Sequence, residues 1–134
     1  MVAHTTPHAP TVLAIDDEDY IADLIATALT LEGYDASVAY NGRDGLAQVH
    51  AQHFDLIIVD IMMPYINGLS LVEQIRQLEQ MRAVPIILIS AGAHPPHMLP
   101  SVTFLAKPFN IERLLQLVAE WVGRPKHERE QDGP

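Results

Sequence analysis

The stretch from Leu56 to Pro64, which reads LIIVDIMMP, decides the fold that we expect for this chain. Its first four residues form a continuous apolar run, without the alternation of a strand that is half exposed. Such a run is typical of a strand buried on both faces of a parallel sheet. A single carboxylate, Asp60, follows the run. We therefore expect a buried strand that ends at a charged side chain.

Segments of the same kind recur on both sides of this stretch. We expect further strands at Thr11–Ile15, around residues 34–40, at Pro85–Ile89 and at Val102–Leu105. Apolar residues at helical spacing predict the intervening helices, with faces that include Ile21, Leu24, Ile25, Ala28 and Leu29, then Leu46 and Val49, then Leu69, Val72, Ile75 and Leu78, and last Ile111, Leu114, Leu115, Val118, Trp121 and Val122. Alternating strands and helices need crossover connections, so we expect a five-stranded parallel sheet in a doubly wound α/β fold.

Length, charge and composition narrow the functional classes. The chain has 134 residues, no cysteine and a formal net charge of −9. The lack of cysteine excludes a disulfide scaffold and thiolate metal sites, and it fits a cytoplasmic protein. The acidic balance argues against binding to nucleic acid or to an anionic membrane, and the apolar runs are too short to span a bilayer. We expect a flexible arm at residues 1–10, one domain at 11–122 and a tail or linker stub at 123–134.

Most of the expected strands end at a residue that can take part in chemistry. Asp16 and Asp17 follow the first strand, Asp60 the third, Ser90 the fourth and Lys107 the fifth. The carboxyl ends of parallel strands meet at one edge, where such sheets bind ligands. Crowded carboxylates repel one another, and a hard divalent cation, with magnesium the expected choice, relieves that repulsion. With the lysine and the hydroxyl, the set suits a phosphoryl group, and a carboxylate could form an aspartyl phosphate.

Each of these residues also has an ordinary structural explanation. Asp16 and Asp17 could cap the following helix, and Asp60 could be a turn residue. Ser90 could be a loop serine and Lys107 a solvated surface lysine. Their occurrence in order, at successive strand ends, is what favours a functional site.

The ordered set resembles the receiver domain of response regulators in two-component signalling, in particular single-domain regulators of the chemotaxis type. The motifs that carry the resemblance are Asp16-Asp17-Glu18, Asp60 to Pro64 with Gly68, Ser90-Ala91 and Lys107-Pro108-Phe109. The resemblance covers roughly residues 10–122. It implies a flavodoxin-like sheet with strand order 2-1-3-4-5.

The resemblance implies roles for residues of the magnesium site. Asp60 would accept the phosphoryl group and, with Asp17, would bind Mg²⁺ directly. Asp16 would hold the metal mainly through water, and the backbone carbonyl of Met62 would complete the protein ligands. Self-phosphorylation from a donor, followed by slow hydrolysis, would be the only catalysis, so the protein would be a switch and not an enzyme.

The resemblance also implies how the switch works. Lys107 would contact the phosphoryl group and Asp60, and Ser90 would donate a hydrogen bond to the phosphoryl group. Phe104 would be the switch aromatic, and the Lys107-Pro108 peptide bond would be cis. The phosphodonor would be a sensor histidine kinase or a histidine phosphotransfer protein, and the output a contact with a downstream protein. We expect a monomer or weak dimer.

The sequence departs from the family between Ser90 and Lys107. This segment is short by roughly a helical turn or more and contains three prolines, at 95, 96 and 100. We expect the fourth helix of the family to be shortened or lost, and we expect residues 92–101 to form a mobile segment that recognises a partner. The pair His94 and His97 in this segment is interpreted as loop histidines and not as a metal site.

Two alternatives to a phosphorylated switch remain open. One is a docking module with a receiver-like fold that binds its partner regardless of phosphate. The other is a magnesium-dependent phosphatase of the haloacid-dehalogenase type. Those enzymes place a second acid two residues after the nucleophile, where this chain has Met62.

Overall fold

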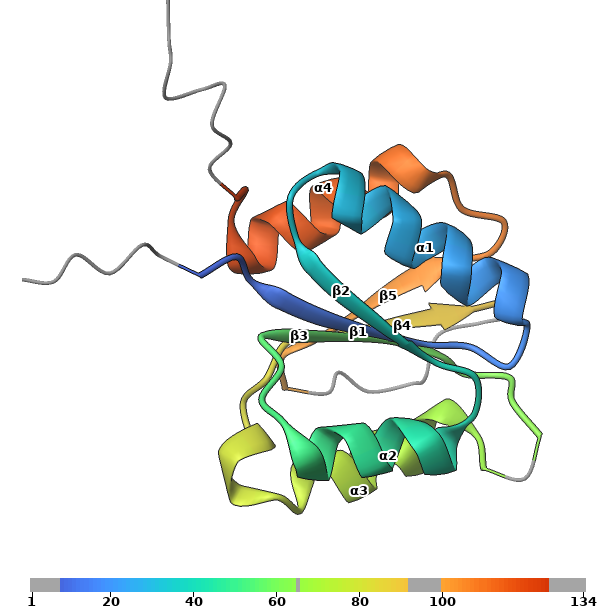
Figure 1. Cartoon of the computed structure of the whole chain (residues 1–134). Coiled ribbons are helices and arrows are strands. Elements are labelled where there is room, and N and C mark those ends of the chain that lie inside the picture. Colours follow the sequence, from blue (N-terminus) through green and yellow to red (C-terminus); the bar gives the residue numbers. More distant parts are fainter. Residues whose placement is uncertain (1–7, 65, 92–99, 126–134) are drawn as a thin grey trace, which may run out of the picture.

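The fold is a single parallel sheet with helices on both faces (Figure 1). The computed structural model describes residues 8–64, 66–91 and 100–125. The elements run in the order β1 (Thr11–Ile15), α1 (Asp19–Leu31), β2 (Asp35–Ala39), α2 (Gly42–Ala51), β3 (Leu56–Asp60), α3 (Gly68–Arg76), a 3-10 turn (Glu79–Met81), β4 (Ile86–Ser90), β5 (Val102–Ala106) and α4 (Ile111–Val122). All five predicted strands are present, and the bounds of each strand lie within about one residue of the expected ones.

The strand order confirms the doubly wound prediction. The sheet runs β2-β1-β3-β4-β5, and every neighbouring pair is parallel. Helices α1 and α4 cover one face, and α2 and α3 cover the other (Figure 1). β3 lies at the centre, and all five of its residues are buried. The continuous apolar run from Leu56 to Val59 therefore belongs to the middle strand of the sheet.

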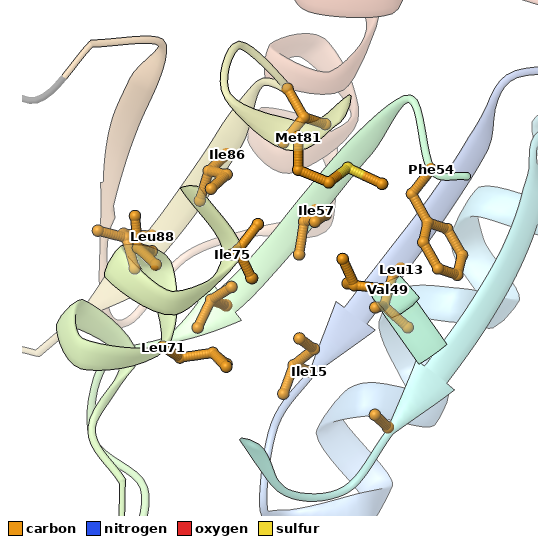
Figure 2. Close-up of a cluster of buried hydrophobic side chains, with 14 of the residues drawn as sticks. Leu13, Ile15, Val49, Phe54, Ile57, Leu71, Ile75, Met81, Ile86 and Leu88 are labelled. Atoms are coloured by element: carbon orange, nitrogen blue, oxygen red, sulfur yellow. The ribbon is translucent and has the colours of Figure 1, made fainter. Parts of the chain in front are cut away.

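The two faces of the sheet carry separate hydrophobic clusters. Under α2 and α3, the side chains of Phe54, Leu71, Ile75 and Met81 pack onto the strands (Figure 2). The second cluster joins the other face of the sheet to Ile25 and Leu29 of α1 and to Leu114 and Val118 of α4. Each fully buried side chain of this size stabilises the fold by roughly 1.5–3 kcal/mol relative to an exposed one. The parallel pairing of neighbouring strands places their carboxyl ends at one edge of the sheet.

Asparagine side chains begin three of the four helices among the described residues. Asn41, Asn67 and Asn110 each accept a hydrogen bond from the backbone N–H three residues later. The predicted opening of a helix at Asn67-Gly68 is confirmed. A Cβ on Gly68 would lie 2.7 Å from the Asp60 carbonyl oxygen, so only glycine lets α3 begin this close to the end of β3.

The connection from β4 to β5 agrees with the expected departure from the family. The residues that the structure describes contain four α-helices, and the last of them follows β5. This agrees with a shortened or lost helix between β4 and β5. Residues 92–99, including two of the three prolines and both loop histidines, lie outside the described residues, so the mobility of 92–101 stays a prediction.

Trp121 belongs to the predicted apolar face of the last helix, and we expected it to lie in the core, but this is wrong. Its side chain is 39 % exposed, and its ring N–H donates to the Thr103 hydroxyl, 3.0 Å away on β5. β5 is an edge strand, so a ring that packs over it remains partly in solvent. Leu24, one of the apolar residues whose spacing predicts α1, is 50 % exposed. Leu78 lies beyond α3, which ends at Arg76.

Candidate functional site

Four strands bring the predicted site residues to the same edge of the sheet. Asp16 and Asp17 follow β1, Asp60 ends β3, Ser90 ends β4, and Lys107 follows β5. Asp16, Asp60 and Ser90 are buried, with 1 %, 2 % and 5 % of their surfaces exposed, whereas Asp17 is exposed. Buried carboxylates are rare unless a partner compensates them.

The three carboxylates form a compact group of potential metal ligands. One oxygen from each of Asp16, Asp17 and Asp60 lies within 4.8 Å of the others. Asp16 Oδ1 accepts a hydrogen bond of 2.9 Å from the backbone N–H of Glu18, but its Oδ2 is buried without a partner among the described residues. A buried oxygen with no donor is costly, and a hard cation would satisfy it. The group could therefore hold a metal ion that prefers oxygen ligands.

Burial and the neighbouring carboxylates both disfavour the ionised form of Asp16. Burial raises the pKa of this carboxyl from its ordinary value of 3.8 to about 6, and the charges of Asp60 and Asp17 act in the same direction. The Glu18 amide and the Lys107 ammonium oppose the rise in pKa without cancelling it. The ionised form of Asp16 is thus disfavoured where it lies, and a divalent cation beside it would favour that form.

Both oxygens of Asp60 are held by neighbouring donors. Oδ1 accepts the backbone N–H of Met62 at 3.1 Å, and Oδ2 accepts Lys107 Nζ at 3.2 Å. The bond to the Met62 N–H stabilises the turn after β3, as expected for a turn residue. The same Asp60 side chain also forms an ion pair with Lys107, 47 positions away in the sequence. Met62 itself turns its side chain to solvent, with 67 % exposed.

Lys107 is a partly buried lysine that points into the site. Burial disfavours its ammonium, but the hydrogen bond to Asp60 and the charges of Asp60, Asp16 and Glu18 outweigh this and raise its pKa. Its backbone N–H donates to the Ser90 carbonyl at 2.8 Å, and its bond to Pro108 is cis, as expected. The lysine stays charged at neutral pH and is aimed at the Asp60 carboxylate.

The two residues predicted to form the switch, Ser90 and Phe104, lie on adjacent strands. Ser90 ends β4 opposite Ala106 of β5, and Phe104 lies opposite Leu88, two positions back along the ladder. Phe104 is partly buried and packs against the cluster under α2 and α3. The structure therefore brings the predicted side chains Asp16, Asp17, Asp60, Ser90 and Lys107 to one edge of the sheet. Phe104 lies two residues before the end of β5.

The sequence model of the response regulator receiver domain family matches residues 12–119 of the chain. The chain belongs to this family. The receiver domain is 36 % identical over 109 residues to response regulator ArlR of Staphylococcus aureus, an alignment that covers 78 % of this chain and 48 % of the relative. The chain thus spans about half the length of the curated relatives that it matches.

Solved receiver structures agree with this assignment. The chemotaxis protein CheY4 of Vibrio cholerae superposes with a TM-score of 0.77 at 30 % identity, over 84 % of this chain and 98 % of CheY4. The receiver domain of a Francisella response regulator gives a TM-score of 0.75 at 32 % identity, over 84 % and 95 % of the two chains. The receiver domain is a module of two-component, phosphorylation-based signalling. None of the helices in its described part is long and apolar enough to cross a membrane.

One feature beside the receiver site was missed by sequence reasoning. An apolar pocket of about 500 Å³ borders Lys107 and is formed by α1, by Ala91 and by the loop that leads into α4. Leu24 lines it, and Tyr20 is another large exposed side chain of the same helix. The sequence feature that could have predicted this pocket is the wide apolar face of α1, which has more apolar positions than a single buried stripe requires.

Proposed function

We propose that the protein is a phosphorylation-dependent switch that accepts a phosphoryl group on Asp60 from a histidine kinase or a phosphorelay protein. The observation that carries the proposal is the position of the Asp60 carboxylate, held between Lys107 Nζ and the Met62 amide and crowded by Asp16 and Asp17. An ionised carboxylate needs no general base to act as a nucleophile.

In the proposed transfer, one Asp60 oxygen forms a bond to phosphorus as the bond from phosphorus to the donor nitrogen breaks. The electron pair of that bond stays on the nitrogen, which takes a proton from solvent. Lys107 neutralises charge on the carboxylate and on the phosphoryl oxygens, and the Ser90 hydroxyl donates a hydrogen bond to one of them. Asp16, Asp17, Asp60 and the Met62 carbonyl would hold Mg²⁺, which supplies positive charge that screens both reacting anions.

The proposed output is a change in protein contacts. Ser90 moves toward the new phosphoryl group, and Phe104 on the neighbouring strand turns inward in response. Such a local change of charge can bias an element with two stable arrangements. We infer a downstream protein target, a cytoplasmic location and a monomeric or weakly dimeric state.

We further propose that the phosphodonor protein docks over the apolar pocket beside Lys107. The pocket borders Lys107, exposed Leu24 lines it, and Tyr20 is a second large exposed side chain of α1. An apolar patch next to a reactive group is a usual place for a protein partner. Docking there would bring a phosphohistidine close to Asp60.

Intact-mass spectrometry with acetyl phosphate and Mg²⁺ tests the central proposal. We expect one added phosphoryl group, absent in Asp60→Asn and absent when the metal is chelated. Beryllofluoride binding should depend on the same residue and on the metal. If the wild type shows neither the adduct nor beryllofluoride binding, the switch is refuted, and a docking module that works without phosphate becomes the better account.

A further inference from the structure

Arg76, the last residue of α3, makes an unusual set of contacts at the end of the sheet opposite the phosphate site. Its Nη1 donates to the carbonyl oxygens of Met81 at 2.9 Å and Val84 at 2.7 Å. Its Nη2 donates to those of Pro100 at 3.0 Å and Ser101 at 3.4 Å. We call these four carbonyls the carbonyl cluster. The ion pairs found among the described residues do not include Arg76, so this guanidinium is engaged by backbone oxygens.

The carbonyl cluster joins the starts of two strands. Met81 and Val84 precede β4, and Pro100 and Ser101 directly precede β5. The Ser101 carbonyl also accepts the N–H of Ile86, which is the first bond of the β4–β5 ladder. Ser101 has a left-handed backbone with φ of 58°, which is uncommon for a residue other than glycine. Arg76 therefore holds a strained turn at the point where the register of β5 is set.

The sequence of β5 specifies its own register only weakly. Phe104 packs on the cluster under α2 and α3, while the next residue, Leu105, packs on the opposite cluster. With apolar side chains on both faces, a shift by one residue is poorly penalised by burial. β5 is also an edge strand, so β4 alone pairs with it.

A register shift would disrupt the phosphate site at the far end of the strand. One residue of a strand spans about 3.3 Å, which is as long as the 3.2 Å contact between Lys107 Nζ and Asp60. We propose that Arg76 is a positioning residue that fixes the register of β5 and thereby aims Lys107 at Asp60. The part of this proposal that concerns Lys107 rests on the proposed function, whereas the part that concerns β5 does not.

The test compares Arg76→Met with the wild type by hydrogen exchange of the full chain. We expect amides of β5 to lose about tenfold or more in protection relative to those of β1 and β3. Arg82→Met is the matched control, since Arg82 is exposed and lies in the same region, and it should exchange like the wild type. Equal changes in β5, β1 and β3, or no change in β5, would overturn the proposal.

A second measurement separates positioning from general destabilisation. At saturating Mg²⁺, beryllofluoride affinity should fall about tenfold in Arg76→Met, because in the proposed function Lys107 would contact the phosphoryl mimic. Mg²⁺ affinity should change less than twofold, because its predicted ligands lie directly after β1, at the end of β3 and in the loop that follows β3. Equal loss of both affinities would overturn the link to Lys107. A wild type that binds no beryllofluoride would refute the proposed function and leave the exchange test of β5 intact.

Arg76→Lys keeps the proposal testable if the methionine variant does not fold. Lysine keeps the positive charge and the aliphatic part of the side chain, but it lacks the planar guanidinium, here called the fork, whose N–H groups reach four carbonyls. We expect β5 protection between those of the wild type and of a variant without the fork, with a loss of about threefold or more. Protection equal to the wild type would show that the fork is not needed and would overturn the proposal.

Discussion

Replacing Asp16 by asparagine is expected to stabilise the metal-free protein near neutral pH. Asp16 is buried, one of its oxygens lacks a donor, and its pKa is raised to about 6. Asparagine has the same shape and can still accept the Glu18 N–H through its oxygen. It removes the buried charge and its repulsion with Asp60. The substitution therefore relieves a strain that the native site carries when no cation is bound.

The magnitude follows from the difference between the folded and ordinary pKa values. The folded protein holds the Asp16 proton more tightly than the unfolded chain, so ionisation of this group weakens folding as the pH rises from 3.8 through about 6. At about 1.4 kcal/mol per pH unit, the full penalty above that window is about 3 kcal/mol. We expect Asp16→Asn to be more stable by this amount at about pH 7.5, and by only about 1 kcal/mol at about pH 4.5.

Urea denaturation with a chelator present measures this difference. Asp17→Asn is the matched control, because Asp17 belongs to the same cluster but is exposed, and we expect its free energy of unfolding to stay within about 0.5 kcal/mol of the wild type. Adding Mg²⁺ should raise the free energy of unfolding of the wild type more than that of Asp16→Asn, since a ligand that binds only the folded state stabilises it. If Asp16→Asn is less stable than the wild type in chelator at neutral pH, the reasoning about the buried charge is refuted.

Three further substitutions test the site and its support. Lys107→Met should slow labelling by acetyl phosphate about 100-fold while Mg²⁺ binds at least as tightly, and unchanged labelling in mass spectra would contradict the role of the ion pair. Leu24→Glu, at an exposed position of the apolar pocket, should leave acetyl phosphate labelling intact but slow transfer from a phosphorylated donor protein, and equal transfer rates would argue against docking there. Gly68→Ala should lower the free energy of unfolding by about 3 kcal/mol in urea, because its Cβ would clash with backbone of the β3–α3 loop; a loss below about 0.5 kcal/mol would contradict the close packing.

Much of the site could be predicted from local sequence because of a property of parallel sheets. The apolar runs mark strands, and all strands end at the same edge, so a residue that follows a run is placed without knowledge of the tertiary structure. This is why Asp60, Ser90 and Lys107 could be grouped from separate parts of the chain. The same reasoning could not distinguish Asp16 from Asp17, because burial of one and exposure of the other depend on how the chain turns into α1.

Errors arose where side chains lie at the borders of packed layers. Trp121 has the helical spacing of a core residue, yet it packs over an edge strand and stays partly exposed. Leu24 continues the apolar face of α1 beyond the stripe that the sheet covers and instead lines the pocket beside Lys107. Periodicity reports which residues are apolar, but the width of the neighbouring layer decides how many of them are buried.

The sequence by itself determined the order of strands and helices, the parallel sheet and the set of residues at its functional edge. These depend on apolar runs and on spacing, which are local properties of the chain. Only the tertiary structure decided that Lys107 reaches Asp60, that one oxygen of Asp16 is left without a donor, and that Arg76 ties the starts of β4 and β5 together. Those facts depend on distances between segments far apart in sequence, which are set by strand pairing and by how the helices pack across it.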